Sequence, residues 1–138
     1  MITRFRVRYG ECDPSGVAHH SSYFLWFEQG RADLLRARGV DYNAMEMSKL
    51  YLPVVDANCR YIVGVKYDDE LELQTLITEQ RSRTVRFESK LYRGGILVAS
   101  ASTYHCLMNG DGKAQKWPEL LVNCFMPDAD FPGSKAGT

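Results

Sequence analysis

The start of the chain shows a strict alternation of apolar and polar residues. Residues 3 to 9 alternate as in a half-buried strand, with Phe5, Val7 and Tyr9 on one face and Arg4, Arg6 and Arg8 on the other. Gly10 and the cluster Pro14-Ser15-Gly16 then end the alternation with residues that form turns. We therefore expect a first strand over residues 3 to 9 and a loop over about residues 10 to 20.

A helical period follows this loop. Apolar and polar residues separate onto two sides from Ser21 or Ser22 onward, which predicts one long helix over about residues 22 to 38. Either serine is a suitable N-cap, and Gly39 is suited to the position just after the helix. Gly30 lowers helix stability by about 1 kcal/mol relative to alanine, so we expect it where the helix packs closely on a sheet.

The rest of the chain has the period of two that strands show. Four strands are expected, over about residues 52 to 63, 69 to 79, 83 to 93 and 96 to 108. Asp68-Asp69 and Arg93-Gly94-Gly95 stand where hairpin connections are expected, so antiparallel neighbours are predicted. The order of elements predicts an α+β domain in which one helix covers one face of an antiparallel sheet. We place this single domain at residues 1 to 126, followed by a short flexible tail at residues 127 to 138.

Composition and charge narrow the class of protein. The 138 residues include 17 Lys and Arg and 17 Asp and Glu, so no net field attracts nucleic acid or an anionic membrane. The sequence contains no apolar run of the length needed for a signal peptide or a membrane span. The spacing of Cys12, Cys59, Cys106 and Cys124 indicates neither a disulfide framework nor a metal site. We expect a cytoplasmic protein with reduced thiols, no membrane or nucleic-acid partner and no bound metal.

Asp13 is the candidate catalytic residue, and it has two interpretations. Aspartate before proline and serine is typical of an ordinary turn. The loop also leads to a helix start, whose free N–H groups and positive dipole end suit a developing oxyanion. A carboxylate there is able to attack a thioester carbonyl, or to take a proton from an attacking water. Chemistry alone leaves both interpretations open.

The segment from Tyr9 to Glu28 resembles the hot-dog-fold 4-hydroxybenzoyl-CoA thioesterase family. The motif reads Tyr9-Gly-Glu-Cys-Asp13-Pro-Ser-Gly16-Val and continues through His20 and Tyr23 into an aromatic helix. The resemblance extends over roughly residues 3 to 108. It implies a hot-dog fold, with an antiparallel five-stranded sheet wrapped around one long helix, and hydrolysis of an acyl-CoA to a free acid and CoA.

The resemblance also implies roles for particular residues. Asp13 matches the catalytic carboxylate, as nucleophile or general base, and the backbone N–H of His20 polarises the thioester carbonyl. Gly16 and Tyr23 match positions that shape the substrate pocket. His19 departs from the usual large residue there, and Ala18 replaces a branched one, so the shape of the acyl pocket and the acyl group remain open. Glu28 lies where related thioesterases often carry an acid, and an ion pair is the alternative role.

The coenzyme part of the substrate carries phosphates and calls for basic residues. Arg81 and Arg83, expected two apart at a strand start, are candidates, and protection of a sheet edge is the alternative. Arg60, Lys66 and Lys90 are further candidates that the sequence does not rank. CoA enters as part of the substrate, so no separate cofactor is expected.

The resemblance further implies a homodimer through a continuous sheet, or a homotetramer as a dimer of dimers. Two other functions remain open: an acyl-thioester hydratase or dehydratase, and an acyl-CoA-binding module without turnover. An acyl-carrier protein in place of CoA is also open.

Overall fold

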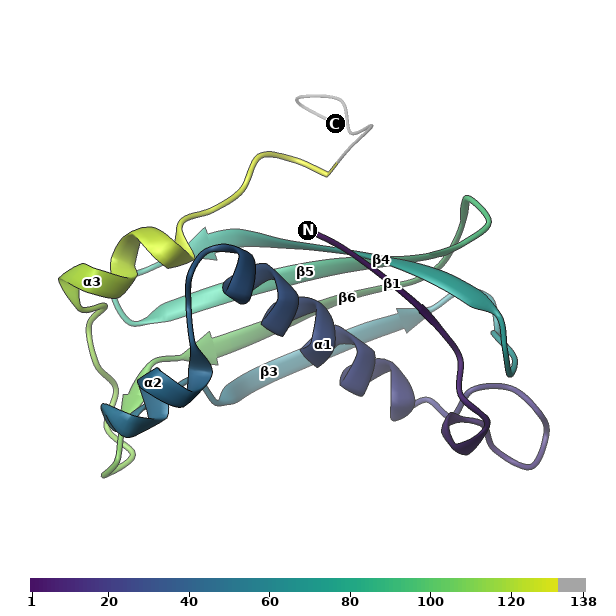
Figure 1. The fold of residues 1–138 in the computed structure, drawn as a ribbon, viewed down its shortest axis with the longest axis horizontal. Helices are drawn as coiled ribbons and strands as arrows, with labels where there is room; N and C mark the ends of the chain where they lie inside the picture. Colours follow the sequence, from purple (N-terminus) through teal and green to yellow (C-terminus); the bar gives the residue numbers. More distant parts are fainter. Residues whose placement is uncertain (132–138) are drawn as a thin grey trace.

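The computed structural model describes residues 1 to 131 and contains a five-stranded antiparallel sheet with one long helix across one face (Figure 1). The strands are β1 (Ile2–Arg6), β3 (Val54–Tyr61), β4 (Glu70–Gln80), β5 (Thr84–Arg93) and β6 (Ile96–Cys106), in the spatial order β1-β4-β5-β6-β3. The long helix α1 spans Ser22–Ala37. This is the predicted α+β arrangement, and the predicted helix is confirmed to within one residue at its end.

Several short elements complete the described chain. They are the 3-10 helices η1 (Tyr9–Glu11) and η2 (Asn123–Phe125), the helices α2 (Tyr42–Met47) and α3 (Glu119–Val122), and the paired strands β2 (Leu50–Tyr51) and β7 (Met108–Asn109). The sequence predicted none of them, because each is too short for a period to become visible. No helix of the described residues has the length and apolar character needed to cross a membrane.

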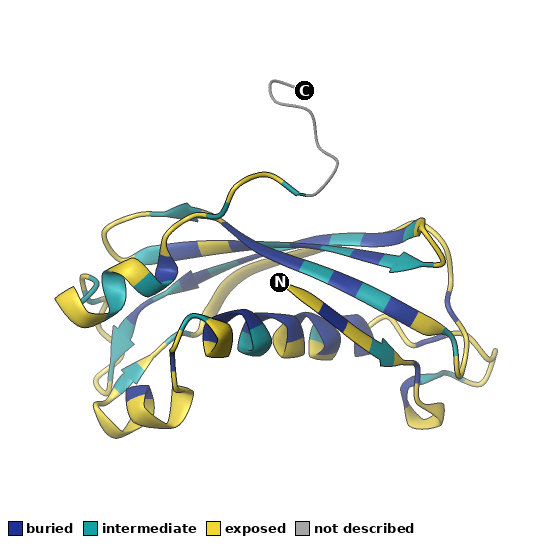
Figure 2. Cartoon of the chain, turned by 45° about the horizontal axis from the view of Figure 1, so that its top comes forward, coloured by how far each residue is buried: buried dark blue, intermediate teal, exposed yellow. Residues whose placement is uncertain are grey.

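Helix α1 packs directly on the sheet. Its buried residues lie on the side that faces the strands, as the dark blue side of the helix shows in Figure 2. A Cβ atom added at Gly30 would lie 2.4 Å from Thr75 Oγ1 and 2.7 Å from Leu73 Cδ2, so the predicted close approach is confirmed. Gly39 has a φ of +82° and ends the helix as expected.

Two predictions about the strands are wrong. The first strand ends at Arg6 rather than residue 9, because the chain turns into η1, where Tyr9 is 80 % exposed. Asp68-Asp69 does not connect a hairpin, since β3 pairs with β6 whereas β4 pairs with β1 and β5. Residues 62 to 69 instead cross between strands that are not neighbours. The Gly94-Gly95 turn does join β5 to β6, with φ angles of +56° and +84°.

The chain is still attached to the sheet just beyond the predicted domain boundary. The Asp128 backbone N–H donates to Ile77 O at 2.8 Å, and its side chain accepts from Ile77 N at 2.8 Å. Asp128 also forms an ion pair with Arg38 at the end of α1. Residues 132 to 138, the larger part of the predicted tail, lie outside the described residues.

Candidate active site

A tight hairpin over residues 12 to 18 carries the Asp13 carboxylate. Cys12 pairs with Ala18, and the Asp13 N–H donates to Val17 O at 2.9 Å. Asp13 O accepts from Gly16 N at 3.0 Å, which closes a β-turn with proline in its second position. The φ of +89° at Gly16 favours glycine there, so Gly16 serves the turn and lies at the hairpin tip.

The Asp13 side chain is held by one oxygen and free at the other. Its Oδ1 accepts the Ser15 backbone N–H at 2.8 Å and also the Ser15 hydroxyl. Its Oδ2 accepts no hydrogen bond from residues 1 to 131. The Ser15 hydroxyl holds the pKa of Asp13 below its ordinary value, and nearby His19 acts in the same direction. Asp13 therefore stabilises its own turn and still presents an ionised oxygen.

The histidines define the start of α1. His19 N donates to Glu11 O at 2.8 Å, which returns the chain from the hairpin to the helix. His19 Nδ1 lies 2.7 Å from Ser21 Oγ and accepts from Ser21 N at 3.2 Å. Ser21 stands at the N-cap, as predicted, although its side chain makes no hydrogen bond to the helix backbone. His19, two residues earlier in the chain, orders Ser21 through these two contacts.

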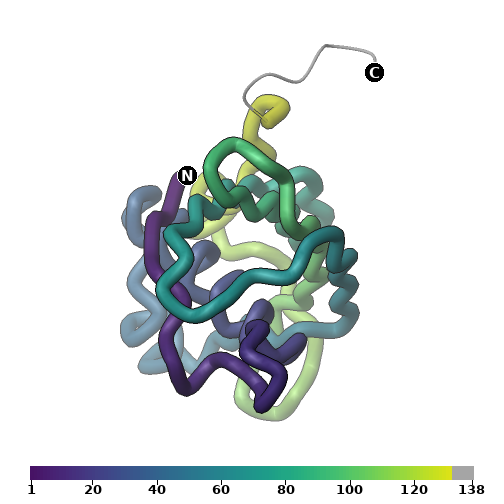
Figure 3. The backbone as a smooth tube through the Cα atoms, turned by 90° about the vertical axis from the view of Figure 1, so that its right-hand side faces the viewer, coloured from purple at the N-terminus to yellow at the C-terminus, as the bar shows by residue number. Residues whose placement is uncertain are grey.

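His20 presents a free backbone donor at the helix start. Its carbonyl accepts the Tyr61 hydroxyl at 2.8 Å, and its exposed ring lies 4.2 Å from the ring of His19. Its backbone N–H makes no hydrogen bond within the described part of the chain. Because the Asp13 hairpin folds back onto the same helix start, the structure brings Asp13, His19 and His20 to one end of the molecule. Figure 3 views this end, with residues 10 to 20 in purple and the crossing segment 62 to 69 in teal.

Glu11 fixes this end to the helix, although sequence reasoning did not identify it. The buried carboxylate accepts Trp26 Nε1 at 2.7 Å and the Arg8 backbone N–H at 2.7 Å. Its backbone oxygen also accepts the Ser22 hydroxyl at 2.8 Å. Only its position two residues before Asp13 hints at this role in the sequence.

Tyr23 and Glu28 lie outside the Asp13 hairpin, Tyr23 in the core and Glu28 on the exposed side of α1. Tyr23 is 3 % exposed, with its ring 4.8 Å from those of both Trp26 and Tyr61, and burial raises its pKa. It is a core residue at the base of the site. Glu28 is exposed on α1 and forms no ion pair within residues 1 to 131, so the structure brings it neither to Asp13 nor into the expected ion pair.

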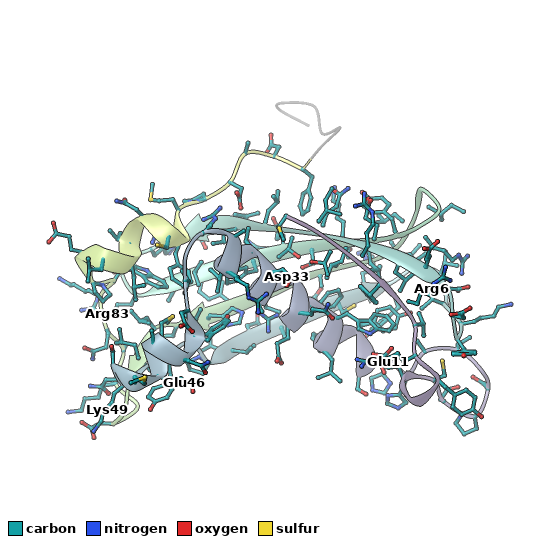
Figure 4. The ribbon with its side chains drawn as sticks, in the orientation of Figure 1. Arg6, Glu11, Asp33, Glu46, Lys49 and Arg83 are labelled. Atoms are coloured by element: carbon teal, nitrogen blue, oxygen red, sulfur yellow. The ribbon has the colours of Figure 1, made fainter. Side chains whose placement is uncertain are left out.

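Arg81 and Arg83 do not reach Asp13 within one chain. Figure 4 shows Arg83 and Glu11 at opposite ends of the sheet. The prediction that both arginines start a strand is wrong, because they lie in the turn before β5, where Arg81 N donates to Thr84 O at 2.9 Å. Arg81 is paired with Glu79 at 3.0 Å. Among the basic candidates, Lys66 lies beside the hairpin, since its backbone pairs with Val17.

The described residues contain no cluster of three or more His, Cys, Asp or Glu side chains arranged for a metal ion. Cys12, Cys59, Cys106 and Cys124 are all free thiols, as the sequence predicted.

Comparison with known proteins assigns the chain to a family. The model of the thioesterase-like superfamily matches residues 7 to 125. The chain belongs to the thioesterase-like superfamily. The acyl-CoA thioester hydrolase YbgC of Escherichia coli O6:H1 is 30 % identical over 122 residues, which cover 88 % of this chain and 79 % of that protein.

Solved structures agree with this assignment. The crystal structure of a hypothetical protein from Aquifex aeolicus has a TM-score of 0.87 and 32 % identity, and the match covers 91 % of this chain and 99 % of that one. A 4-hydroxybenzoyl-CoA thioesterase complexed with 4-hydroxybenzoyl-CoA has a TM-score of 0.82, 21 % identity and coverage of 91 % and 98 %. That likeness concerns the fold alone. It confirms the hot-dog fold of this member of the superfamily.

Proposed function

We propose that this chain hydrolyses acyl-CoA thioesters and that Asp13 is its catalytic carboxylate. The observation that carries the proposal is the ionised carboxylate of Asp13, held through Oδ1 and free at Oδ2, on a hairpin that folds back to the start of α1. Membership of the thioesterase-like superfamily supports the reaction class. The activity named for the Escherichia coli relative supports CoA as the carrier.

In the proposed reaction, the helix start stabilises charge and Asp13 starts the chemistry. The thioester carbonyl accepts a hydrogen bond from the His20 N–H, where the helix dipole also favours the developing oxyanion. Asp13 either attacks the carbonyl carbon, giving an anhydride that water then hydrolyses, or takes a proton from a water that attacks directly. In both routes the carbon–sulfur bond breaks, and the CoA thiolate leaves and takes a proton. No step requires a separate cofactor.

For the CoA phosphates we propose Lys66, because it is exposed and its backbone pairs with the Asp13 hairpin. Arg81 and Arg83 are able to serve the same substrate only from another copy of the chain. Lys66→Gln is expected to raise KM for an acyl-CoA several-fold but to leave KM unchanged for an acyl thioester that lacks the phosphates. An equal effect on both substrates, or an effect confined to Arg81→Gln with Arg83→Gln, would contradict the assignment to Lys66.

We further propose a homodimer formed through the free edge of β3. Almost every residue of this strand is exposed, as its yellow course in Figure 2 shows, and among the described strands only β6 pairs with it. Val54 and Val55 are 48 % and 52 % exposed on this edge. An exposed edge strand that carries apolar side chains promotes pairing with another chain. Because Tyr61 of β3 contacts His20, such pairing sets the active site at the subunit boundary.

Sedimentation velocity tests the dimer. The wild-type chain is expected to sediment as a dimer or as a tetramer built from dimers. Val55→Lys is expected to give a monomer, because like charges then meet across the interface. Ile96→Lys, at an exposed site on β6, serves as the matched control. A monomeric wild-type chain, or dissociation by both variants alike, would refute pairing through β3.

A reducing compartment such as the cytoplasm is the proposed location, because the four thiols are free.

The reaction is tested by release of free CoA thiol from a panel of aliphatic and aromatic acyl-CoAs. We expect turnover of at least one member, with the free acid as the second product. Hydration of an enoyl-CoA without thiol release would indicate the hydratase alternative. Binding of acyl-CoA without any product would indicate a binding module. Either result would overturn the proposed hydrolysis.

A further inference from the structure

Helix α1 buries an arginine that forms no ion pair with the described residues. Arg31 is 8 % exposed and lies on the sheet-facing side of the helix. Its Nη1 donates to Thr103 Oγ1 at 3.5 Å, and no Asp or Glu of residues 1 to 131 lies within 4.0 Å of it. A buried charge costs several kcal/mol unless it is paired, and arginine does not lose its proton in proteins. The guanidinium is therefore suited to an anion from outside the described chain.

Two polar neighbours, Thr103 and His105, orient Arg31 without neutralising it. His105 Nδ1 lies 3.1 Å from Leu52 O, which only accepts, so Nδ1 carries the proton. Burial lowers the pKa of His105 to about 4, so the ring is neutral and its Nε2 is an acceptor. The Thr103 hydroxyl, 2.9 Å away, therefore donates to Nε2 and accepts from Arg31. One donor of the guanidinium is used, and its remaining donors have no partner in the described chain.

Arg31 lies beside the face of β3 that is turned toward α1. One end of this face lies at the start of α1. At one end the Tyr61 hydroxyl contacts His20 O. Further along, Ala57 pairs with Thr103, the residue that Arg31 contacts. Residues 57 and 61 share a face of β3, and both are exposed although that face is turned toward α1. A chain-like ligand that begins at His20 and lies between α1 and β3 therefore reaches Arg31.

The position of Arg31 along α1 sets the length of this ligand. Arg31 is nine residues after Ser22, which corresponds to about 13 Å along the axis of α1. Arginine side chains on a helix lean toward its N-terminus, so the guanidinium lies somewhat nearer to His20. An acyl group of medium length spans this distance.

We propose that Arg31 binds a carboxylate at the far end of the acyl group, so that the substrates are medium-chain acyl-CoAs of dicarboxylic acids. The proposal rests on the proposed thioesterase function and names its substrate class. A carboxylate matches the planar guanidinium fork through two parallel hydrogen bonds. It also supplies a negative charge in direct contact with the guanidinium, whereas the exposed Glu28, one turn earlier on α1, is near enough to favour the charged guanidinium but forms no ion pair with it.

The test compares two eight-carbon substrates that differ only at their far end, suberyl-CoA with a carboxylate and octanoyl-CoA with a methyl group. Wild-type protein is expected to show the higher kcat/KM for suberyl-CoA. Arg31→Met is expected to lower the ratio of the two kcat/KM values about ten- to a hundredfold, as for loss of a charged hydrogen bond. Arg36→Met is the matched control, because Arg36 is an exposed arginine of the same helix paired with Asp33, and its ratio is expected to equal the wild-type ratio.

A second variant and a binding measurement keep the test decisive. Thr103→Val retains Arg31 but removes its acceptor, and it is expected to lower the same ratio if Arg31→Met does not fold. Free suberate is expected to raise the Tm of the wild type more than octanoate does, and Arg31→Met is expected to lose that difference. If octanoyl-CoA is hydrolysed and the ratio is the same in wild type and variants, the role of Arg31 is refuted while the hydrolysis stands. If no acyl-CoA is hydrolysed but suberate still binds through Arg31, the proposed function is refuted and the site stands.

Discussion

The Glu11 carboxylate accepts a 2.7 Å hydrogen bond from the indole of Trp26 and so joins the segment before Asp13 to the first turns of α1. Trp26→Phe keeps an aromatic ring but removes the donor. We expect it to lower the free energy of unfolding by about 1.5 to 3 kcal/mol, as for a hydrogen bond to a charged group, and to lower kcat because Asp13 is held less firmly. Urea titration and thiol release measure the two effects.

A control for this prediction is available at the other end of the sheet. Trp117 Nε1 donates to Arg81 O at the same distance of 2.7 Å. Trp117→Phe is therefore expected to lower stability but to leave kcat unchanged. Equal loss of kcat in the two variants, or no coupling energy between Glu11→Gln and Trp26→Phe in a double-mutant cycle, would contradict a positioning role for Glu11.

The pH dependence of kcat/KM is expected to report the ionisation of Asp13. The Ser15 hydroxyl lowers the pKa of Asp13, so activity is expected to be lost only below the ordinary aspartate value of about 3.9. Ser15→Ala removes a hydrogen bond that favours the ionised form of Asp13, so the acid limb of its pH profile is expected to move to higher pH. Ser15→Thr keeps the hydroxyl and is expected to keep the acid limb of the wild type. A limb that stays in place or moves lower in Ser15→Ala would refute this account, provided that circular dichroism shows folded protein at each pH.

Buried His105 is expected to make stability depend on pH. Its pKa is about 4 in the folded chain and about 6.5 when unfolded, so the unfolded chain binds the extra proton between these values. The contribution is complete above pH 6.5 and is lost as pH falls toward 4, by up to about 3 kcal/mol. His105→Gln should therefore lose less stability than the wild type between pH 7 and pH 4 in urea titrations. Parallel curves for the two proteins would show that His105 does not contribute.

Gly30 is expected to tolerate no side chain. A Cβ there would lie within 2.7 Å of Thr75 and Leu73, and overpacking of this kind typically costs about 1 to 3 kcal/mol. This cost exceeds the gain of about 1 kcal/mol in helix propensity from Gly30→Ala. Gly10→Ala, where no atom lies within 4 Å of the added Cβ, is the control. A more stable Gly30→Ala would show that the sheet yields at this contact.

The helix and the strands were predicted from the sequence better than the pairing of the strands was. Strands β4, β5 and β6 and helix α1 each bury one face, so their periods of two and 3.6 residues are visible in the sequence. The pairing of β3 with β6 is not visible, because residues 62 to 69 look like a hairpin connection but carry the chain to a distant strand. Arg8 and Tyr9 continue the alternation of β1, yet the chain turns there because Glu11 accepts the Arg8 N–H.

The candidate site was predicted in part for a similar reason. The Asp13 loop and the following helix start are local features and were found from adjacent residues. Glu11 with Trp26, and Arg31 with Thr103, are contacts across 15 and 72 residues, and neither leaves a pattern in the sequence. Arg81 and Arg83 were selected for charge alone, and charge carries no information about which end of the sheet a residue occupies.

The most direct test of the account is the rate of thiol release by Asp13→Asn, with the acyl-CoA that the wild type hydrolyses best. Asparagine still accepts the Ser15 N–H through its side-chain oxygen, so the hairpin is expected to remain folded and to keep the wild-type Tm. Asp111→Asn, at an exposed aspartate of another turn, is the matched control and is expected to retain full activity. The account predicts that Asp13→Asn loses a factor of about 10² to 10⁴ or more in kcat. Wild-type turnover by a folded Asp13→Asn protein would contradict it.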